Sequence, residues 1–254
     1  MKLKKEKVLI LRAISVIGTI LVSHIAQAAI SLDRTRVIFN GDQKSISLNI
    51  SNNNKQLPYL AQAWIDDENG KKITSPLVVL PPVQRIEPAS ASQVKIESLN
   101  DINRLPQDRE SFFYFNLREI PPKSGKPNTL QIALQTRVKL FYRPKGIIPE
   151  KMGVPWQEKL TMTKQGGKMI VKNPTPYYVT LINAAESVKA LDNQSKQEFT
   201  PIMIPPFGEK DLGISAGILG AHPVLSYIND YGGRPTLTFQ CQSTHCQVIS
   251  ENKF

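Results

Sequence analysis

The chain has 254 residues, of which 32 are Lys or Arg and 21 are Asp or Glu, for a formal net charge of +11. It begins with four lysines in seven residues, followed by an apolar run over Ala13–Val22 and the small-x-small sequence Ala26–Ala28. This order is typical of a secretory signal, so we expect residues 1–28 to be cleaved. The apolar run is shorter than the ~20 residues that cross a bilayer, and no later run approaches that length, which argues against membrane insertion.

Cleavage would remove five Lys or Arg and one Glu, which leaves 226 residues with a net charge of +7. No cluster of Lys and Arg is interleaved with aromatic residues, as a nucleic-acid-binding groove requires, so nucleic acid is not expected as a partner. The excess charge fits a solvated basic surface, or a surface that meets acidic proteins or a carboxylate. A chain of this length is expected to form two domains of about 100–120 residues.

Short alternating runs dominate the first half, while nineteen prolines and fourteen glycines interrupt the chain and helical periodicity is nearly absent. Seven strands within about 115 residues predict an immunoglobulin-like β-sandwich over residues 29–146. This half has no cysteine, so Trp64 is expected to pack in a core that lacks a disulfide. The seven runs are 31–39, 45–50, 59–65, 77–80, 94–97, 112–117 and 130–140.

The run Leu130–Leu140 is the longest strand signal in the chain. Its even positions are apolar except Thr136, and its odd positions are mostly Gln, Arg or Lys, so one face of the strand is apolar. It comes last in the first half and is followed by Arg143 and Pro144. We therefore expect an edge strand with free backbone groups, which is either an aggregation hazard or a binding site.

The second half predicts another β-sandwich, over residues 147–254. Glycines and prolines in residues 145–155 indicate a connection between domains. Further strand runs follow at 160–162, 169–171, 177–182, 199–204 and 224–228, with a hairpin around the two cysteines. The predicted fold class is therefore all-β, with two sandwich domains and a cleft between them.

The two cysteines, Cys241 and Cys246, have four residues between them and strand-like flanks. This spacing suits a disulfide across a hairpin in an oxidising compartment. A redox-active pair is the alternative, but no Cys-x-x-Cys sequence at a helix N-terminus supports it.

Signals for catalysis are weak. Gly213–Gly217 matches the Gly-x-Ser-x-Gly turn of α/β-hydrolases, with Ser215 followed by Asp230 and His245 in the order of that fold. That turn needs a parallel sheet with helices, which the sequence does not predict, and a glycine-rich loop explains the same residues. The two histidines of the mature chain, His222 and His245, are too few and too far apart for a metal cluster. No nucleotide-binding motif is present, and the scattered carboxylates give a glycosidase pair no support, so we expect no enzyme, metal or cofactor.

The segment Leu105–Pro122 resembles the signature of periplasmic pilus chaperones, the family typified by PapD. The resemblance extends over almost all of residues 30–250 and is strongest in the first domain, whereas residues 185–222 are individual to this chain. Further similar segments are 31–36, 55–64, 130–144, 173–178 and 227–235.

The resemblance implies a boomerang of two immunoglobulin-like domains that binds pilus subunits whose own sandwich lacks its last strand. The chaperone lends an edge strand until another subunit's N-terminal extension replaces it at the outer-membrane usher, which is a form of β-strand addition. It also implies the periplasm of a Gram-negative bacterium, with pilins, adhesin and usher as partners. It leaves open which fimbrial system is served and whether the free chain dimerises to cover its edge.

The family's site residues are transferred position by position. Arg36 and Lys139 match the cleft pair that anchors the subunit's terminal carboxylate through charge-assisted hydrogen bonds. Leu130, Ile132 and Leu134 match the apolar residues that fill the subunit's groove. Because Leu134 and Lys139 are an odd number of residues apart, we expect a twist or bulge between them, or else one assignment is wrong.

Three charged residues, Glu110, Arg143 and Asp230, match a trio that the family places between its two domains. Such a network would hold the angle between the domains, although exposed ion pairs are individually weak. Ordinary surface charges remain the alternative interpretation of this trio.

Two rival hypotheses are kept. The chain could itself be an exported pilus subunit or adhesin, although a subunit should have an incomplete sandwich and an alternating N-terminal extension. It could also be a secreted hydrolase that uses Ser215.

Overall fold

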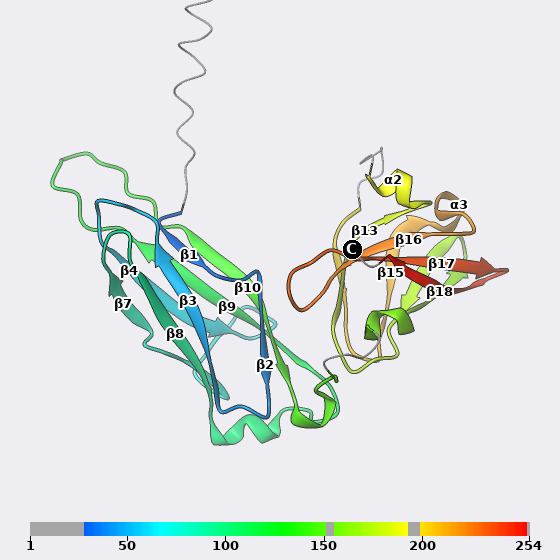
Figure 1. Cartoon of the computed structure of the whole chain (residues 1–254), viewed down its shortest axis with the longest axis horizontal. Coiled ribbons are helices and arrows are strands. Elements are labelled where there is room, and N and C mark those ends of the chain that lie inside the picture. Colours follow the sequence, from blue (N-terminus) through cyan, green and yellow to red (C-terminus); the bar gives the residue numbers. More distant parts are fainter. Residues whose placement is uncertain (1–27, 151–154, 193–198, 253–254) are drawn as a thin grey trace, which may run out of the picture.

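The computed structural model describes residues 28–150, 155–192 and 199–252, which form two β-rich lobes arranged as a V (Figure 1). Nearly all of the expected signal peptide, residues 1–27, lies outside the described residues. Within the described ranges, no helix has the length and apolar character needed to cross a membrane.

The N-terminal lobe is a sandwich of two sheets. One sheet has the order β1-β3-β8-β6, with β1 Ile30–Leu32, β3 Ser45–Asn52, β8 Ala91–Ser98 and β6 Leu77–Leu80. The other has the order β2-β10-β9-β4-β5, with β2 Arg36–Asn40, β10 Gln135–Arg143, β9 Ser111–Ile120, β4 Tyr59–Asp66 and β5 Lys72–Ile73. Strand β7, Val83–Ile86, also pairs with β4. A short 3-10 helix, η1, covers Asn100–Arg104.

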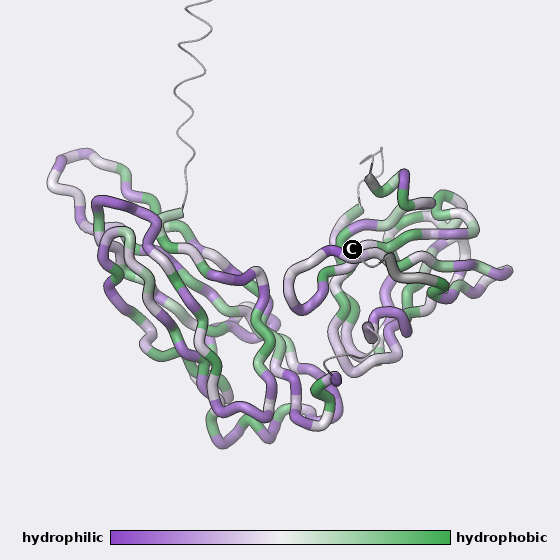
Figure 2. The backbone as a smooth tube through the Cα atoms, in the orientation of Figure 1, coloured by the Kyte–Doolittle hydropathy of each residue, from purple (hydrophilic) through white to green (hydrophobic). Residues whose placement is uncertain are grey.

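The core of this lobe follows from the alternation along the strands, which Figure 2 shows as changing hydropathy along the tube. Val37, Phe39, Phe115 and Leu140 are fully buried between the two sheets. Each large apolar side chain removed from water in this way contributes roughly 1.5–3 kcal/mol. On β2 and β10 the residues between these core positions consequently face away from the sandwich interior.

Two expected strands differ from those in the structure. The run 31–39 is divided, because β1 pairs with β3 in one sheet while β2 pairs with β10 in the other. The run 130–140 is a strand only from Gln135, and residues 130–134 belong to no strand. Apolar alternation identified the face of each segment, but a strand also needs a neighbour that supplies hydrogen bonds.

The expectation for Trp64 was wrong. Its neighbours Ala63 and Ile65 are in the core, so Trp64 lies on the outer face of β4 and is only partly buried. Its indole Nε1 donates to Asp66 Oδ1 at 2.9 Å, and the Arg118 guanidinium lies 5.0 Å from the ring centroid. The polar edge of the indole is thereby satisfied without burial in the sandwich.

The C-terminal lobe is a second sandwich, built from one continuous path of eight strands. The order is β14-β13-β16-β17-β18-β11-β12-β15, and the end strands β14 and β15 contact each other, so the path closes around its own core. The strands are β11 Thr161–Gln165, β12 Lys168–Lys172, β13 Val179–Ala185, β14 Ile202–Ile204, β15 Glu209–Ser215, β16 Val224–Ile228, β17 Thr236–Gln242 and β18 His245–Asn252. The short helices are η2 Lys145–Ile147, η3 Trp156–Lys159, α2 Val188–Asp192 and α3 Ala216–Leu219.

The two lobes confirm the predicted all-β fold of two immunoglobulin-like sandwiches in a boomerang. The predicted disulfide is also present, between Cys241 on β17 and Cys246 on β18. These residues are direct neighbours across the β17–β18 hairpin.

We predict that the disulfide stabilises the C-terminal lobe alone. Replacing Cys241 and Cys246 by Ser should lower the free energy of unfolding of this lobe by about 2 kcal/mol, because the bond closes only a short loop. Trp156 packs against the C-terminal core and Trp64 lies in the other lobe, so denaturant unfolding can be followed by Trp156 fluorescence in a Trp64→Phe background. The matched control keeps Trp64 and carries Trp156→Phe. A similar loss in the Trp64 signal would show that the effect is not confined to the C-terminal lobe.

Candidate binding site in the interdomain cleft

Arg36 and Lys139 lie side by side at the point where β2 first meets β10. They are register partners in the parallel pairing of the two strands, and both face away from the N-terminal core. Arg36 is only 9% exposed, and its Nη1 donates to the Ile228 carbonyl oxygen at 3.1 Å. Lys139 is partly buried, and its Nζ donates to Thr180 Oγ1 at 3.3 Å. The two cations therefore point toward the C-terminal lobe and share one site.

The charge of this pair is poorly compensated. Among the described residues, no carboxylate lies within ion-pair distance of either group, and the buried Arg36 Nε has no hydrogen-bond partner. Burial lowers the pKa of the Arg36 guanidinium, while Asp230 and Glu110 act in the opposite direction. Burial also lowers the pKa of Lys139, and the charge of Arg36 adds to this effect. A carboxylate bound here would offset the cost of burying both cations.

Strand β10 has a neighbour on both sides along only part of its length. It pairs with β9 from Gln135 to Tyr142 but with β2 only from Lys139 onward. No strand of the described chain pairs with residues 135–138 on the β2 side. The predicted edge is therefore present along residues 135–138, whereas from Lys139 onward β2 covers it and the prediction was wrong. Backbone groups along this edge are available to a strand of another chain.

Leu130, Ile132 and Leu134 precede this edge and are exposed by 84%, 65% and 43%. The segment is attached to the domain by the Glu119 N–H, which donates to the Leu134 carbonyl at 3.0 Å, and by the Gln131 side chain, which donates to the Pro122 carbonyl. Three exposed apolar side chains so close in sequence are unusual on a protein surface and indicate an interaction site.

No bulge separates Lys139 from the start of β10. The register between β10 and β9 runs without a shift from Gln135 to Tyr142. Even-numbered residues of β10 therefore face the sandwich core and odd-numbered residues face the cleft. The predicted bulge is therefore absent from Gln135 onward, and because residues 130–134 belong to no strand, the odd spacing does not fix which way Leu134 faces relative to Lys139.

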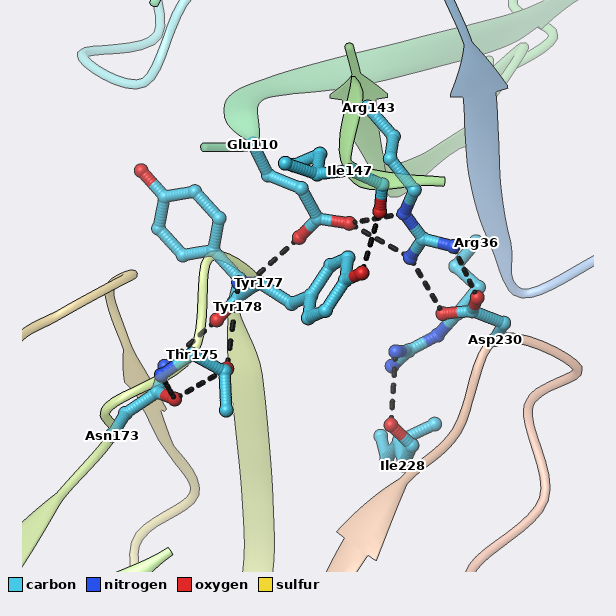
Figure 3. A network of polar contacts seen from close by, with 10 residues as sticks. All are labelled: Arg36, Glu110, Arg143, Ile147, Asn173, Thr175, Tyr177, Tyr178, Ile228 and Asp230. Atoms are coloured by element: carbon cyan, nitrogen blue, oxygen red, sulfur yellow. Dashed lines mark hydrogen bonds and ion pairs between the residues drawn. The ribbon is translucent and has the colours of Figure 1, made fainter. Parts of the chain in front are cut away.

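The charged trio is brought together between the lobes (Figure 3). The Arg143 guanidinium contacts Glu110 Oε1 through Nη2 at 2.7 Å and Asp230 Oδ2 through Nη1 at 2.8 Å. The second Glu110 oxygen accepts from the Tyr178 N–H at 2.8 Å. Arg143 and Glu110 are both only 3% exposed, and the rings of Trp156 and Tyr177 flank the guanidinium. Because Asp230 and Tyr178 belong to the other lobe, this network joins the two domains, and the surface-charge interpretation was wrong.

The buried Glu110 carboxyl is the pH-sensitive member of this network. Burial raises the pKa of Glu110 from 4.5 to about 7, against the lowering effect of Arg143 and of the Tyr178 N–H. Between pH 4.5 and about pH 7, the Glu110 carboxyl keeps its proton in the folded chain but has released it in the unfolded chain. The contribution of this carboxyl to stability therefore falls as the pH rises through that range.

We predict that Glu110→Gln removes this pH dependence. The difference in free energy of unfolding between wild type and Glu110→Gln should decrease from pH 5 to pH 7, by up to about 1.4 kcal/mol per pH unit, and should level off above. Denaturant unfolding of both proteins at matched ionic strength measures this difference. A difference that stays constant between pH 5 and pH 7 would show that Arg143 holds the carboxyl ionised in the folded chain over this range.

The Gly213–Gly217 turn lacks the hydrolase geometry. It lies at the end of β15, which pairs antiparallel with β12, and Ser215 Oγ accepts from the Gly217 N–H at the start of the one-turn helix α3. Both Asp230 carboxylate oxygens are engaged by Arg143. Nor do the described residues contain a group of His, Cys, Asp or Glu that could hold a metal ion.

Sequence reasoning missed the C-terminal side of the cleft. Thr180 and the Ile228 carbonyl complete the surroundings of the two cations, and Tyr178 completes those of Glu110. A carbonyl group carries no side-chain signal, and one Thr within a strand is ordinary. Their participation depends on how the two lobes meet, which residue spacing does not encode.

Comparison with known proteins decides the family. The N-terminal domain model of PapD, a pili and flagellar-assembly chaperone, matches residues 29–148, and the PapD C-terminal domain model for pili assembly chaperones matches residues 155–239. The chain belongs to the family of pilus-assembly chaperones. Chaperone protein PapD of Escherichia coli is 54% identical over 227 residues, which cover 89% of this chain and 92% of that protein. The probable fimbrial chaperone YfcS of Escherichia coli K12 is 53% identical over 226 residues, covering 89% and 88%.

Solved chaperone structures agree with the pilus-chaperone fold. The E. coli chaperone DraB superposes with a TM-score of 0.67 at 26% identity, covering 85% of this chain and 98% of that one. The SafB chaperone, solved in complex with the Salmonella enterica SafA pilin, gives a TM-score of 0.66 at 25% identity, covering 85% and 97%. This family of periplasmic chaperones of chaperone–usher pili acts in folding and assembly rather than in catalysis. Membership in this family therefore argues against both the hydrolase hypothesis and the pilus-subunit hypothesis.

Proposed function

We propose that this chaperone holds a pilus subunit by pairing the subunit's C-terminal strand with the open edge of β10. The observation that carries the proposal is the position of Arg36 and Lys139 at the closed end of that edge. A strand placed beside residues 135–138 lies in line with β2 and has to stop where β2 begins. Its terminal carboxylate then meets the two poorly compensated cations.

This arrangement also determines the direction of the bound strand. A chain that ends at Lys139 and extends back toward Leu130 runs parallel to β10, as β2 does. Anchoring the last carboxylate fixes which residue of the client faces each residue of β10. A slip of one residue would turn every client side chain to the wrong face, so the anchor sets the register.

The exposed residues Leu130, Ile132 and Leu134 supply the apolar part of the interaction. In the proposed complex they fill the groove of a subunit whose own sandwich lacks a strand. Each buried side chain contributes roughly 1.5–3 kcal/mol, and the backbone hydrogen bonds add to this. The client thereby completes its fold on the chaperone.

The remaining assignments complete this account. Residues 29–146 form the strand-donating domain, and residues 147–254 form the second wall of the cleft. The chain acts in the periplasm after loss of residues 1–28, where the Cys241–Cys246 disulfide is stable. It delivers subunits to an outer-membrane usher, and the free chain covers its apolar edge by self-association.

We predict that Arg36→Ala and Lys139→Ala each weaken client capture by about ten- to a hundredfold. Each removes charge-assisted hydrogen bonds, which contribute about 1.5–3 kcal/mol apiece. Copurification of a co-expressed pilin from the periplasm measures capture. Arg85→Ala is the matched control, since Arg85 on β7 forms an exposed ion pair with Glu87. Undiminished binding by both cleft variants would contradict the anchoring role.

We predict that Ile132→Asp abolishes capture while the free chaperone stays folded. Ile132 is 65% exposed in the free chain, so a carboxylate there costs little until the client's apolar groove has to accept it. Thermal unfolding and pilin copurification are measured together. The control is Ala133→Asp, which adds the same charge at the next, exposed position. Equal capture by the two variants would contradict an interaction specific to one face.

A further inference from the structure

A row of cations extends from the anchoring pair along the cleft-facing side of the N-terminal sheet. Arg36 and Lys139 form its first rung. Arg137 lies two residues before Lys139 on β10 and so faces the same side, about 7 Å further along. Arg118 on β9 lies beside Gln135, the next residue of β10 on this side. We call Arg36, Lys139, Arg137 and Arg118 the cationic row.

Aromatic rings hold the outer two members in place. The Arg137 guanidinium lies 3.7 Å from the centroid of Tyr114, and the Arg118 guanidinium lies 5.0 Å from that of Trp64. Both arginines are nevertheless exposed. Stacking on a ring limits the positions of a charged group and leaves its outward N–H groups free to donate.

Few carboxylates balance the row. Among the described residues, only Asp66 comes within ion-pair distance, 3.6 Å from Arg137, and none does so for Arg36, Lys139 or Arg118. Asp66 is also occupied by the Trp64 indole at 2.9 Å and by the Asn116 amide at 2.9 Å. Asp230 and Glu110 act on Arg36 only from beyond ion-pair distance, so the four cations have one partly engaged carboxylate in contact, which leaves a positive strip beside the open edge of β10.

We propose that the cationic row recognises acidic side chains on the client strand that lies beside β10. This inference rests on the proposed function, because the anchor supplies the register. With the client's terminal residue beside Lys139, the second residue before it lies across from Arg137. The fourth residue before it lies across from Gln135, next to Arg118. Opposite charges at facing positions of adjacent strands stabilise the pairing, which applies directly to Arg137. Arg118 is one strand further from the client, with its Nη2 donating to Gln135 Oε1 at 2.9 Å, so it acts at longer range.

The row therefore adds a specificity rule to a backbone-based interaction. Clients with Asp or Glu at the second and fourth residues before the C-terminus should bind more tightly than clients with neutral residues there. Clients with Lys or Arg at these positions should be disfavoured, because like charges would face each other across the strands.

Three synthetic peptides test this rule with the full chain. Each has twelve residues, alternating Val and Thr, and a free C-terminal carboxylate, and they differ only in having Glu, Gln or Lys at the two positions. Fluorescence anisotropy at low salt should show that the Glu peptide binds about two- to fivefold more tightly than the Gln peptide per facing pair. The Lys peptide should bind more weakly than the Gln peptide. Raising the salt concentration should reduce these differences, because both arginines are exposed.

Charge reversal assigns the effect to the row. Arg137→Glu should reverse the order of the Glu and Lys peptides when only the second position before the C-terminus is varied. Lys95→Glu is the matched control, because it changes the net charge equally on β8 of the opposite sheet, where Lys95 pairs with Glu97 at 2.7 Å. Arg137→Gln should lose the preference between the Glu and Lys peptides at this position while its unfolding temperature stays unchanged. This result separates recognition from a purely structural role of Arg137 in covering Tyr114.

Equal affinity of the wild type for all three peptides would overturn the rule and leave the anchoring proposal intact. A preference for Glu that persists in Arg137→Glu would likewise overturn it. If no peptide binds to the wild type, or if Arg36→Ala binds as well as the wild type, then the anchoring proposal fails and this inference fails with it.

Discussion

The functional geometry depends on one constraint, which is that β10 acquires its second neighbour only at Lys139. The chain before β2 belongs to the opposite sheet, where β1 pairs with β3. The strand position beside residues 135–138 of β10 is therefore unoccupied in the described chain. Where β2 begins to pair with β10, Arg36 and Lys139 face the cleft as register partners. A single change of sheet thus produces a free edge with a buried Arg36 and a partly buried Lys139 at its end, which together define a site for an extended chain with a carboxylate.

The second lobe makes this site more selective than an exposed edge. Arg143, held between Glu110 and Asp230, fixes the position of the loop that follows β16, and the Ile228 carbonyl accepts from Arg36 just before it. The same lobe places Thr180 against Lys139. Burial by the second lobe keeps the two cations from being fully solvated, so a bound carboxylate gains more there than it would at an exposed edge.

Much of the fold was predictable from the sequence, because period-two alternation and turn residues report local structure. The sheet change between β1 and β2 was not predictable, since the run 31–39 reads as one strand. Leu130–Leu134 reads as strand although only its last carbonyl is paired to β9. Arg36 and Lys139 were found through resemblance to a family, because 103 positions separate them in sequence and only the parallel pairing of β2 with β10 brings them together. Trp64 was misplaced because an aromatic residue in a strand fits the outer face as well as the core.

Hydrogen exchange of the chaperone, measured with and without a bound pilin, reports whether the open edge of β10 holds the subunit. Rapid exchange is expected for the outward-facing amides of residues 130–138 in the monomeric free chain, and strong protection of the same amides is expected in the complex. Residues 139–142 already have β2 and β9 as neighbours and should be protected in both states. If residues 130–138 exchange equally fast with and without the pilin, or are already protected in a monomeric free chain, the open edge of β10 is not where the subunit is held.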